Sequence, residues 1–215
     1  MLKRSEARPK ARIAVLVSGG GTNLQAILDA QAAGRIPHGE VVLVISSRSG
    51  AYALERARAA GIEALTLSRK DCGDQAGFEA ALSQALAQRR IDLVVLAGFL
   101  SILSAEFTAR WPRRILNVHP SLIPAFCGAG FYGLKVHEAA LSKGVKVTGA
   151  TVHYVNEIPD GGEILLQKAV RVHENDTPET LQRRVMEQAE WKLLPRAVEL
   201  VSRQIVSPRH QITNM

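Results

Sequence analysis

The chain has 215 residues, 47% of them hydrophobic, which is ordinary for one globular domain with a sizeable core. No apolar run approaches the ~18 residues of a membrane-spanning helix, and the basic N-terminus lacks the apolar segment of a secretory signal. The formal charge of +7 is concentrated in residues 1–12, with five basic side chains against one acid, and in residues 203–215, with two against none. Because these basic residues form no stripe along a helix, we expect neither a nucleic-acid partner nor a membrane partner.

Cysteine usage indicates a reducing compartment. Cys72 and Cys127 are the only cysteines, and they lie too far apart in sequence to form a metal-binding or redox motif. Two scattered thiols are typical of proteins in the cytoplasm, where disulfides are rare. We therefore expect a cytoplasmic location.

Strands and helices alternate along the first 120 residues. Apolar runs of strand-like length are separated by segments in which apolar residues recur every three or four positions. This alternation predicts an α/β fold with a Rossmann-like, doubly wound and mostly parallel sheet. The expected strands are Ile13–Val17, Val41–Ile45, Ile62–Leu67, Leu93–Leu96 and Ile115–Val118, and the expected helices begin near Thr22, run over Ala51–Ala60, contain Phe78, Leu82 and Leu86, and follow Ser104 as a cap.

The pattern changes after Pro124. A glycine-rich loop over residues 125–133 precedes a short helix and two more strands. The composition of Asn156–Gly162 is that of a turn, so the two strands should form an antiparallel pair. The expected elements are the helix Val136–Leu141 and the strands Val147–Val155 and Ile164–Val172.

A long helix is expected at the C-terminal end. Thr177-Pro178 should open it, because proline is favoured in the first turn of a helix, and Pro195 should kink it. We expect a single domain over residues 1–215. Residues 1–11 and about 204–215 should form flexible tails.

A glycine-rich turn follows the first expected strand, in the order Ser18-Gly19-Gly20-Gly21-Thr22-Asn23-Leu24-Gln25. Thr22 and Gln25 have the spacing of a capping box, which predicts the start of a helix. Backbone N–H groups and the helix dipole at such a start attract anions, phosphate among them. A tight turn without a ligand is the alternative.

This turn departs from two common nucleotide motifs. No Gly-Lys-Ser/Thr follows it, which excludes a P-loop. Gly19 and Gly21 begin a dinucleotide fingerprint, but Leu24 stands at its third glycine, and the second strand is followed by Arg48 rather than by an acid. A nicotinamide oxidoreductase is therefore disfavoured, although Arg48 leaves a weak case for a 2′-phosphate.

Two polar side chains stand at the end of the fifth expected strand. Strand side chains alternate, so Asn117 and His119 should point to the same side. Open α/β sheets bind their ligands at the carboxyl ends of strands. An amide donor beside an imidazole that titrates near neutral pH suits a reaction in which an oxygen gains charge. The structural alternative is that His119 caps a turn and Asn117 satisfies a backbone group.

Four segments together resemble the folate-dependent glycinamide ribonucleotide formyltransferases, and the likeness runs from about Ile13 to Val201. Each segment alone is common, but their conjunction in this order is specific. The segments are Ser18–Ile27, Ala97–Leu103, Asn117-Val-His-Pro-Ser-Leu-Ile-Pro124 and Asp160-Gly-Gly162, which look like the family's phosphate loop, folate-pocket segment, formyltransferase signature and catalytic-aspartate turn.

The resemblance implies a reaction of purine biosynthesis. The amine of glycinamide ribonucleotide would attack the formyl carbon of 10-formyltetrahydrofolate, giving formylglycinamide ribonucleotide and tetrahydrofolate. Asn117 and protonated His119 would stabilise the oxyanion, while Asp160 would favour the imidazolium and help to move protons. No metal is implied. The implied binding residues are Gly21, Thr22 and Asn23 for the phosphate, Glu190 for the ribonucleotide, and Leu100, Ser101, Ile102, Leu103, Asn156, Glu157, Ile158 and Pro159 for the folate.

The sequence departs from the family pattern at three places. Two of them belong to the implied folate region, and the third is the loop that follows the formyltransferase signature. Ser101 stands where many members carry arginine, which affects a folate contact. Gln75 stands at a position that is often basic. The loop Phe126–Gly133 is longer than the usual form, and the sequence assigns it no role.

The assignment of Glu190 depends on how the spacing is counted. It matches the family's ribose-binding glutamate when counted back from Pro195, but counted forward from Arg184 the spacing is one residue too long. A solvated charge on a helix is the alternative. Among the other histidines, we interpret His137 and His153 as structural.

Related functions share part of this pattern. Methionyl-tRNA formyltransferase would need a further C-terminal domain for RNA, and formyltetrahydrofolate hydrolase usually carries an N-terminal regulatory domain, for which residues 1–12 leave no room. A non-catalytic folate- or phosphate-binding protein would have no need of intact Asn117, His119 and Asp160. We expect small-molecule substrates, and either a monomer or a homodimer.

Overall fold

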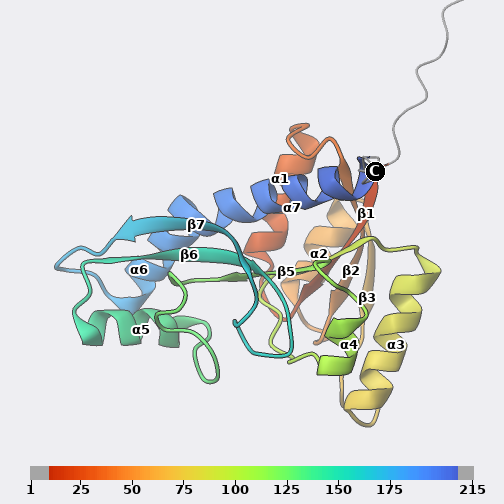
Figure 1. Cartoon of the computed structure of the whole chain (residues 1–215), viewed down its shortest axis with the longest axis horizontal. Helices are drawn as coiled ribbons and strands as arrows, with labels where there is room; N and C mark the ends of the chain where they lie inside the picture. The colour runs from red at the N-terminus through yellow and green to blue at the C-terminus, as the bar shows by residue number, and fades with distance from the viewer. Residues whose placement is uncertain (1–9, 208–215) are drawn as a thin grey trace, which may run out of the picture.

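The computed structural model describes residues 10–207, which form a seven-stranded sheet with helices on both faces (Figure 1). The strand order is β3-β2-β1-β4-β5-β6-β7. Strands β1 to β5 pair in parallel, whereas β6 runs antiparallel to both β5 and β7. The expected α/β sheet with an antiparallel pair is therefore confirmed. The strands are β1 (Ala11–Val17), β2 (Gly39–Ser46), β3 (Glu63–Thr66), β4 (Leu93–Leu96), β5 (Ile115–His119), β6 (Val147–Tyr154) and β7 (Ile164–Arg171).

One helix follows each of the first four strands and leads to the next parallel strand. In Figure 1 the last helix, α7, crosses one face of the sheet, and α3 and α4 lie on the opposite side. The helices are α1 (Thr22–Ala32), α2 (Tyr52–Ala59), α3 (Gln75–Gln88), α4 (Ala105–Ala109), α5 (Leu134–Lys143), α6 (Pro178–Val185) and α7 (Trp191–Val206), with a π-helix, η1 (Met186–Glu190), between the last two.

Strand β1 shows why the sheet has two cores. Ile13, Val15 and Val17 belong to the core that α1 and α7 cover. Ala14 and Leu16 belong to the core under α3, because successive strand side chains point to opposite faces. A strand that is buried on both faces needs a continuous apolar run, which is what the sequence shows at this position.

The crevice of the fold lies where β1 and β4 are neighbours. From this point the sheet continues through β2 and β3 in one direction and through β5 in the other, and open α/β sheets bind ligands at such a point. Ser18, directly after β1, joins the two loops at this edge. Its Oγ accepts a hydrogen bond from the backbone N–H of Leu100 (3.0 Å) and lies 2.7 Å from Oγ of Ser47.

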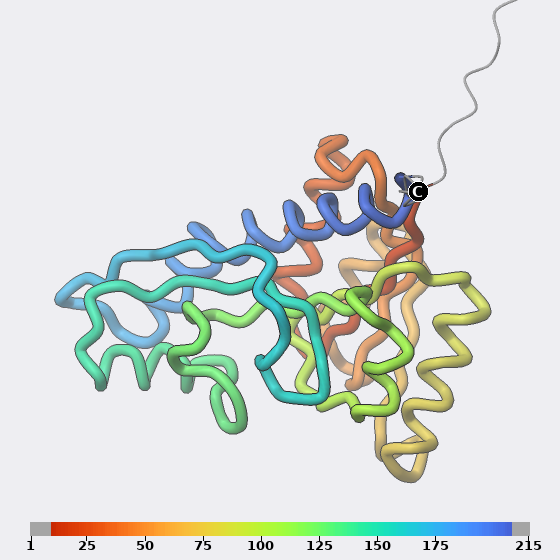
Figure 2. The backbone as a smooth tube through the Cα atoms, in the orientation of Figure 1, coloured from red at the N-terminus to blue at the C-terminus, as the bar shows by residue number. Residues whose placement is uncertain are grey.

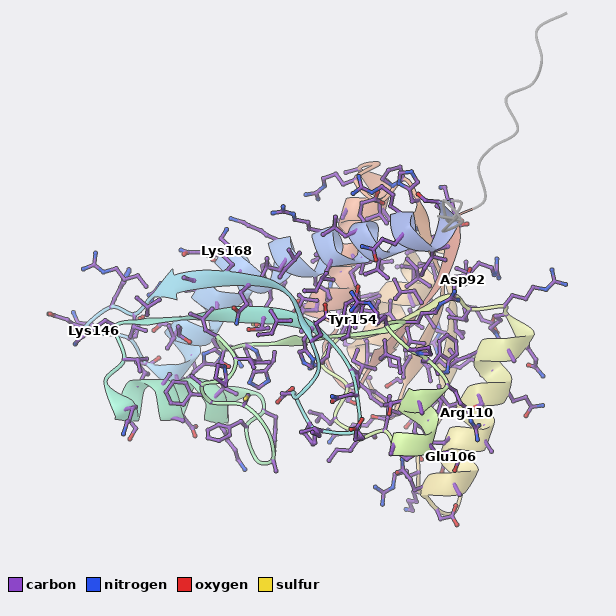
Figure 3. The ribbon with its side chains drawn as sticks, viewed as in Figure 1. Asp92, Glu106, Arg110, Lys146, Tyr154 and Lys168 are labelled. Carbon is purple, nitrogen blue, oxygen red and sulfur yellow. The ribbon has the colours of Figure 1, made fainter. Side chains whose placement is uncertain are left out.

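Two longer loops extend from the same side of the sheet (Figure 2): residues 120–133 after β5, and 155–163 between β6 and β7. The first loop is fixed at its start by β6. Thr151 Oγ1 accepts from the N–H of Ile123 (3.1 Å) and donates to the carbonyl of Ser121 (2.7 Å). The second begins after Tyr154, which lies near the middle of the molecule in Figure 3.

The expected capping box at the start of α1 is wrong, although the helix does begin at Thr22. Gly21 occupies the N-cap position with φ of 73°, and no side chain caps the helix. The side chain of Gln25 is used elsewhere: its amide nitrogen donates to Asp29 (2.8 Å), and its oxygen accepts from Arg56 (2.9 Å). A glycine in the left-handed conformation has therefore replaced the side-chain cap.

The expected single C-terminal helix is divided. Thr177 and Thr180 form a capping box at the start of α6, and the chain then passes through η1 before α7 begins. In η1 the backbone N–H of Trp191 bonds to the carbonyl of Met186, five residues earlier. α7 continues through Pro195, and the kink expected there stays a prediction.

The flexible tails that the sequence predicted, residues 1–11 and about 204–215, overlap the ordered structure at both ends. Ala11 is fully buried in β1, where its N–H donates to the carbonyl of His38 (2.8 Å), and α7 continues to Val206. Both segments are held by pairing or packing that their composition does not reveal. The remaining tail residues, 1–9 and 208–215, lie outside the described residues. Within 10–207, no helix is long and apolar enough to cross a membrane.

Gly162 is required by close packing of the turn on β6. A Cβ atom at this position would lie 1.7 Å from the carbonyl oxygen of Tyr154. We expect Gly162→Ala to lower the free energy of unfolding by about 1–3 kcal/mol, because the turn and the strand must separate. Denaturant unfolding measures this, with Gly50→Ala as the control, since a Cβ there meets nothing within 4 Å. Equal stability of the two variants would contradict the packing.

Candidate active site

A cavity of about 640 Å³ opens at the carboxyl ends of β1, β4 and β5. This volume is in the range of small-molecule sites. Loops after the three strands, the loop 125–133 and the α6–η1 segment all contribute to its wall. Nine of the expected site residues line it: Thr22, Asn23, Leu100, Ile102, Asn117, His119, Pro159, Asp160 and Glu190.

Asp160 lies at the centre of a polar cluster in this cavity. Its Oδ1 accepts a hydrogen bond from Nδ2 of Asn117 (3.3 Å), and its Oδ2 lies 3.4 Å from Nδ1 of His119. The backbone N–H of Gly128 also donates to Oδ2 (2.9 Å). The residue has φ of 56°, a left-handed conformation that aspartate tolerates in turns. The turn thus brings the carboxylate to the end of β5.

The Asp160 carboxylate stays ionised although it is largely buried. Burial alone would raise its pKa, but the neighbouring ring of His153, the N–H of Gly128 and the charge of His119 outweigh burial, so the pKa is lowered. The turn therefore holds a fixed negative charge at the centre of the site.

His119 is held between two oxygen acceptors. Its Nδ1 faces Asp160, and its Nε2 lies 2.8 Å from the carbonyl oxygen of Phe126. The side chain is 4% exposed. Both ring nitrogens thus face oxygen acceptors. Asn117 and His119 both reach Asp160, which agrees with the expectation that they share one side of β5.

His153 belongs to the same cluster, which the sequence interpretation missed. Its Nδ1 donates to the carbonyl of Tyr154 (2.7 Å), and its Nε2 lies 3.1 Å from Nδ2 of Asn117 and 3.5 Å from Oδ1 of Asp160. The antiparallel pairing of β5 with β6 sets His153 opposite Asn117. Only the strand register could have revealed this contact.

Thr22 and Asn23 of the glycine-rich turn line the cavity, whereas Gly21 is not part of its wall and packs closely against α2. A Cβ on Gly21 would lie 2.6 Å from Cβ of Ala53 in α2. Substitutions at Gly21 would therefore disturb packing whether or not the turn binds a ligand. The first backbone N–H groups of α1 have no partners within the helix, which is the feature that attracts an anion.

The side chain of Asn23 is committed to Glu190. Its Nδ2 donates to Oε2 of Glu190 (2.6 Å), which takes up one of the two N–H donors of this amide. Glu190 is 6% exposed, and burial raises its pKa to about 7 against the opposing effect of Asn23. Glu190 is thus a buried site carboxyl, and the solvated-charge alternative is wrong.

The π-helix explains why the two ways of counting to Glu190 differ by one residue. Hydrogen bonds from i+5 to i, as between Trp191 and Met186, take up one residue more than an α-helical turn. Counting residues forward from Arg184 to Glu190 crosses this π-helix. Counting back from Pro195 passes only through the start of α7 before it reaches Glu190. The extra residue lets Glu190 face the cavity while α7 keeps its packing.

The residues expected to bind folate divide into groups. Leu100, Ile102 and Pro159 line the cavity, and the side chains of Leu100 and Ile102 are exposed. Leu103 is buried in the core under α3, and Asn156 stabilises the turn, where its Oδ1 accepts from the N–H of Ile158 (3.0 Å). Ser101, Glu157 and Ile158 are not part of the cavity wall.

Gln75, the first residue of α3, stabilises the segment that follows β4. Its Nε2 donates to the carbonyl of Ile102 (3.1 Å) and to the carboxylate of Glu79 (2.6 Å). This uncharged residue thus helps to place Ile102 at the rim of the cavity. Within residues 10–207, no group of three or more His, Cys, Asp or Glu side chains is placed to hold a metal ion.

The sequence profile of the formyl transferase family matches residues 11–198. The chain belongs to this family. It is 40% identical over 188 residues to the phosphoribosylglycinamide formyltransferase of Haemophilus influenzae, a match that covers 87% of this chain and 85% of that protein. The crystal structure of glycinamide ribonucleotide transformylase 1 from Symbiobacterium toebii has a TM-score of 0.85 and 45% identity, covering 95% of this chain and 92% of the other.

A longer relative matches over only part of its own length. The chain is 43% identical over 194 residues to the trifunctional purine biosynthetic protein adenosine-3 of Bos taurus, which covers 90% of this chain but 18% of that protein. The chain thus spans about a fifth of such relatives. The match to the formyl transferase family nevertheless extends over nearly all of the described residues of this chain.

The buried Glu190 predicts a pH-dependent gain in stability for Glu190→Gln. Because folding raises the pKa of this carboxyl from 4.5 to about 7, ionisation destabilises the folded wild type as pH rises through this window. The difference in unfolding free energy, variant minus wild type, should grow by about 3 kcal/mol between pH 4.5 and pH 7.5.

Denaturant unfolding across this pH range measures the difference. Glu187→Gln is the control, because Glu187 is exposed one turn away in the same π-helix. A Glu190→Gln difference that stays constant with pH, as expected for the control, would show that the Glu190 carboxyl has an ordinary pKa.

Proposed function

We propose that the chain transfers the formyl group of 10-formyltetrahydrofolate to the amine of glycinamide ribonucleotide. The amine nitrogen bonds to the formyl carbon, and the bond from that carbon to N10 of the folate breaks. One amine proton is lost and N10 gains one, so the products are formylglycinamide ribonucleotide and tetrahydrofolate. The reaction is a step of de novo purine biosynthesis, and the names of the relatives support this assignment.

The observation that carries the proposal is the convergence of Asn117, His119 and Asp160 in one cavity. A tetrahedral intermediate needs a donor for its oxyanion and a group that moves a proton, and these three side chains supply both. The same cavity reaches the first turn of α1 and the carboxyl of Glu190. A nucleotide with a phosphate at one end and a reactive amine at the other matches this layout.

The buried charge of Asp160 sets the chemistry of His119. An ionised carboxylate 3.4 Å from Nδ1 stabilises the imidazolium, whose Nε2–H is then the donor for the oxyanion. Asp160 also provides an acceptor for a proton that leaves the attacking amine, directly or through a water molecule. No step requires a metal ion.

Asn117 has two ways of serving this intermediate. As arranged, its Nδ2 is shared between Asp160 and His153, which leaves Oδ1 as an acceptor for the attacking amine. Donation from Nδ2 to the oxyanion requires one of these two bonds to open. The amide therefore exchanges partners, or acts through its oxygen, during the reaction.

The loop 125–133 has to shift during catalysis. The carbonyl of Phe126 is the acceptor for Nε2 of His119, and this is the nitrogen that must reach the oxyanion. The same loop touches Asp160 through the N–H of Gly128. Substrate binding therefore exchanges a carbonyl of the loop for the developing oxyanion. This loop is thus linked to the proposed chemistry through two direct contacts.

The two substrates occupy opposite parts of the cavity in this proposal. Backbone N–H groups of Gly21, Thr22 and Asn23 hold the phosphate, and Glu190 binds the ribose. Leu100, Ile102 and Pro159 contact the folate, with Ser101, Leu103 and the turn Asn156–Ile158 supporting this wall. We further propose a single domain that acts on small molecules in the cytoplasm, as a monomer or a homodimer.

The reaction itself is the first test. Purified protein should convert 10-formyltetrahydrofolate to tetrahydrofolate only when glycinamide ribonucleotide is present, as followed by absorbance and by mass spectrometry of the formylated product. Folate consumption without the ribonucleotide would favour a hydrolase instead. No consumption under either condition, with both ligands still bound, would favour a non-catalytic binding protein.

Asp160→Asn separates a catalytic role from a structural one. Asparagine is nearly isosteric and tolerates the left-handed φ, so the turn should persist and the melting temperature should change by only a few degrees. The lost charge should lower turnover by about 10²-fold or more. Steady-state kinetics and thermal unfolding measure both quantities.

The control for this variant is Asp74→Asn. Asp74 caps α3, where asparagine is an equally good cap, and it lies outside the cavity wall. Its turnover should equal that of the wild type. Retained turnover in a folded Asp160→Asn variant would remove Asp160 from the mechanism.

A further inference from the structure

His137 is a buried polar side chain that the proposed mechanism does not use. It lies in α5, is 0% exposed, and contributes to the wall of the same cavity as His119 and Asp160. Neither of its ring nitrogens has a hydrogen-bonding partner among the described residues. Leaving a buried donor and acceptor unpaired is costly, so a histidine in this position calls for a polar partner on the cavity side.

The ring of His137 is uncharged at neutral pH. Burial, with a smaller contribution from the charge of His119, lowers its pKa from 6.5 to about 4. A neutral imidazole offers one N–H donor and one lone pair. It therefore suits an uncharged polar group with both an acceptor and a donor, and it is poorly suited to a phosphate or a carboxylate.

The position of His137 indicates which part of the ribonucleotide it meets. α5 packs against α6, and the neighbouring part of the cavity wall is formed by Gln182 and Met186. Glu190, at the ribose end, lies one turn beyond Met186. His119, at the reacting end, is near enough for its charge to act on His137. His137 thus lies between the ribose end and the reacting amine.

We propose that His137 hydrogen-bonds the amide that joins the glycine part of the ribonucleotide to its ribose. This inference rests on the proposed function, because it takes glycinamide ribonucleotide as the substrate. The amide is the only polar group of that molecule between the ribose and the amine, and it carries both a carbonyl oxygen and an N–H. The contact fixes the amine for attack and distinguishes this substrate from amines that lack the amide.

His137→Phe tests the contact, because phenylalanine keeps a planar ring and removes both hydrogen-bonding atoms. The KM for glycinamide ribonucleotide should rise about tenfold, which corresponds to about 1.4 kcal/mol, while the KM for the folate stays within about twofold. His137→Gln, whose amide can again donate and accept, should recover most of the loss. Val136→Ala, at a fully buried apolar position of the same helix, controls for loosened packing and should leave both constants unchanged.

A binding measurement on the unaltered protein keeps the test independent of how the variants fold. With ¹⁵N-labelled histidine, saturating glycinamide ribonucleotide should shift the ring resonances of His137, and the folate alone should leave them in place. Unchanged resonances at saturation, an equal rise in both KM values, or failure of glutamine to rescue a folded phenylalanine variant would overturn the assignment. A wild type that binds the ribonucleotide without formyl transfer would contradict the proposed reaction but not this contact.

Discussion

The structure depends on one ionised carboxylate that is kept away from bulk water. Asp160 lies in the turn between β6 and β7, yet Asn117, His119 and His153 from two strands all direct nitrogen atoms toward it, and the loop 125–133 adds a backbone N–H. Each of these groups orders the next, because removing the Asp160 side chain would leave several buried donors without an acceptor. The loops above β5 and beyond β6 are thereby tied together at the point where chemistry is proposed.

This charge also contributes to stability in a defined pH range. Because folding lowers the pKa of Asp160, its contribution is present above the pKa of the unfolded chain and is lost as pH falls through the lower, folded value. Glu190 behaves in the opposite way, since burial raises its pKa to about 7. The two ends of the cavity thus hold one carboxyl that is fixed as an anion and one that titrates near neutrality. Environments that push the pKa values of two carboxyls apart are common where the two groups have different functional roles.

The sequence predicted the elements well where local pattern determines structure. The apolar run Ile13–Val17 predicted β1 and the run Leu93–Leu96 predicted β4, and Ser104 caps α4 as expected, because these features need only neighbouring residues. The capping box at Thr22 failed because Gly21, Asp29 and Arg56 compete for the same roles, and this competition involves residues from another helix. Element types were thus predictable, whereas details set by tertiary contacts were not.

The same distinction holds for the site. Asn117 and His119 follow from strand alternation, but their meeting with Asp160 depended on a family resemblance, since 43 residues separate Asn117 from Asp160. His153 was missed because its role arises from the register of β5 on β6. Glu190 was uncertain because no sequence pattern announces a π-helix, and the inserted residue is visible only once the hydrogen bonds are known.

The central claim is that a buried, ionised Asp160 organises the site. The most direct measurement is the titration of the Asp160 side-chain carboxyl by ¹³C NMR on labelled protein, assigned with Asp160→Asn. The account predicts a pKa below about 3.9, the ordinary value for aspartate, with the ring signals of His119 and His153 changing together with the carboxyl signal. A carboxyl pKa well above that value, or histidine rings that ignore its titration, would contradict the account.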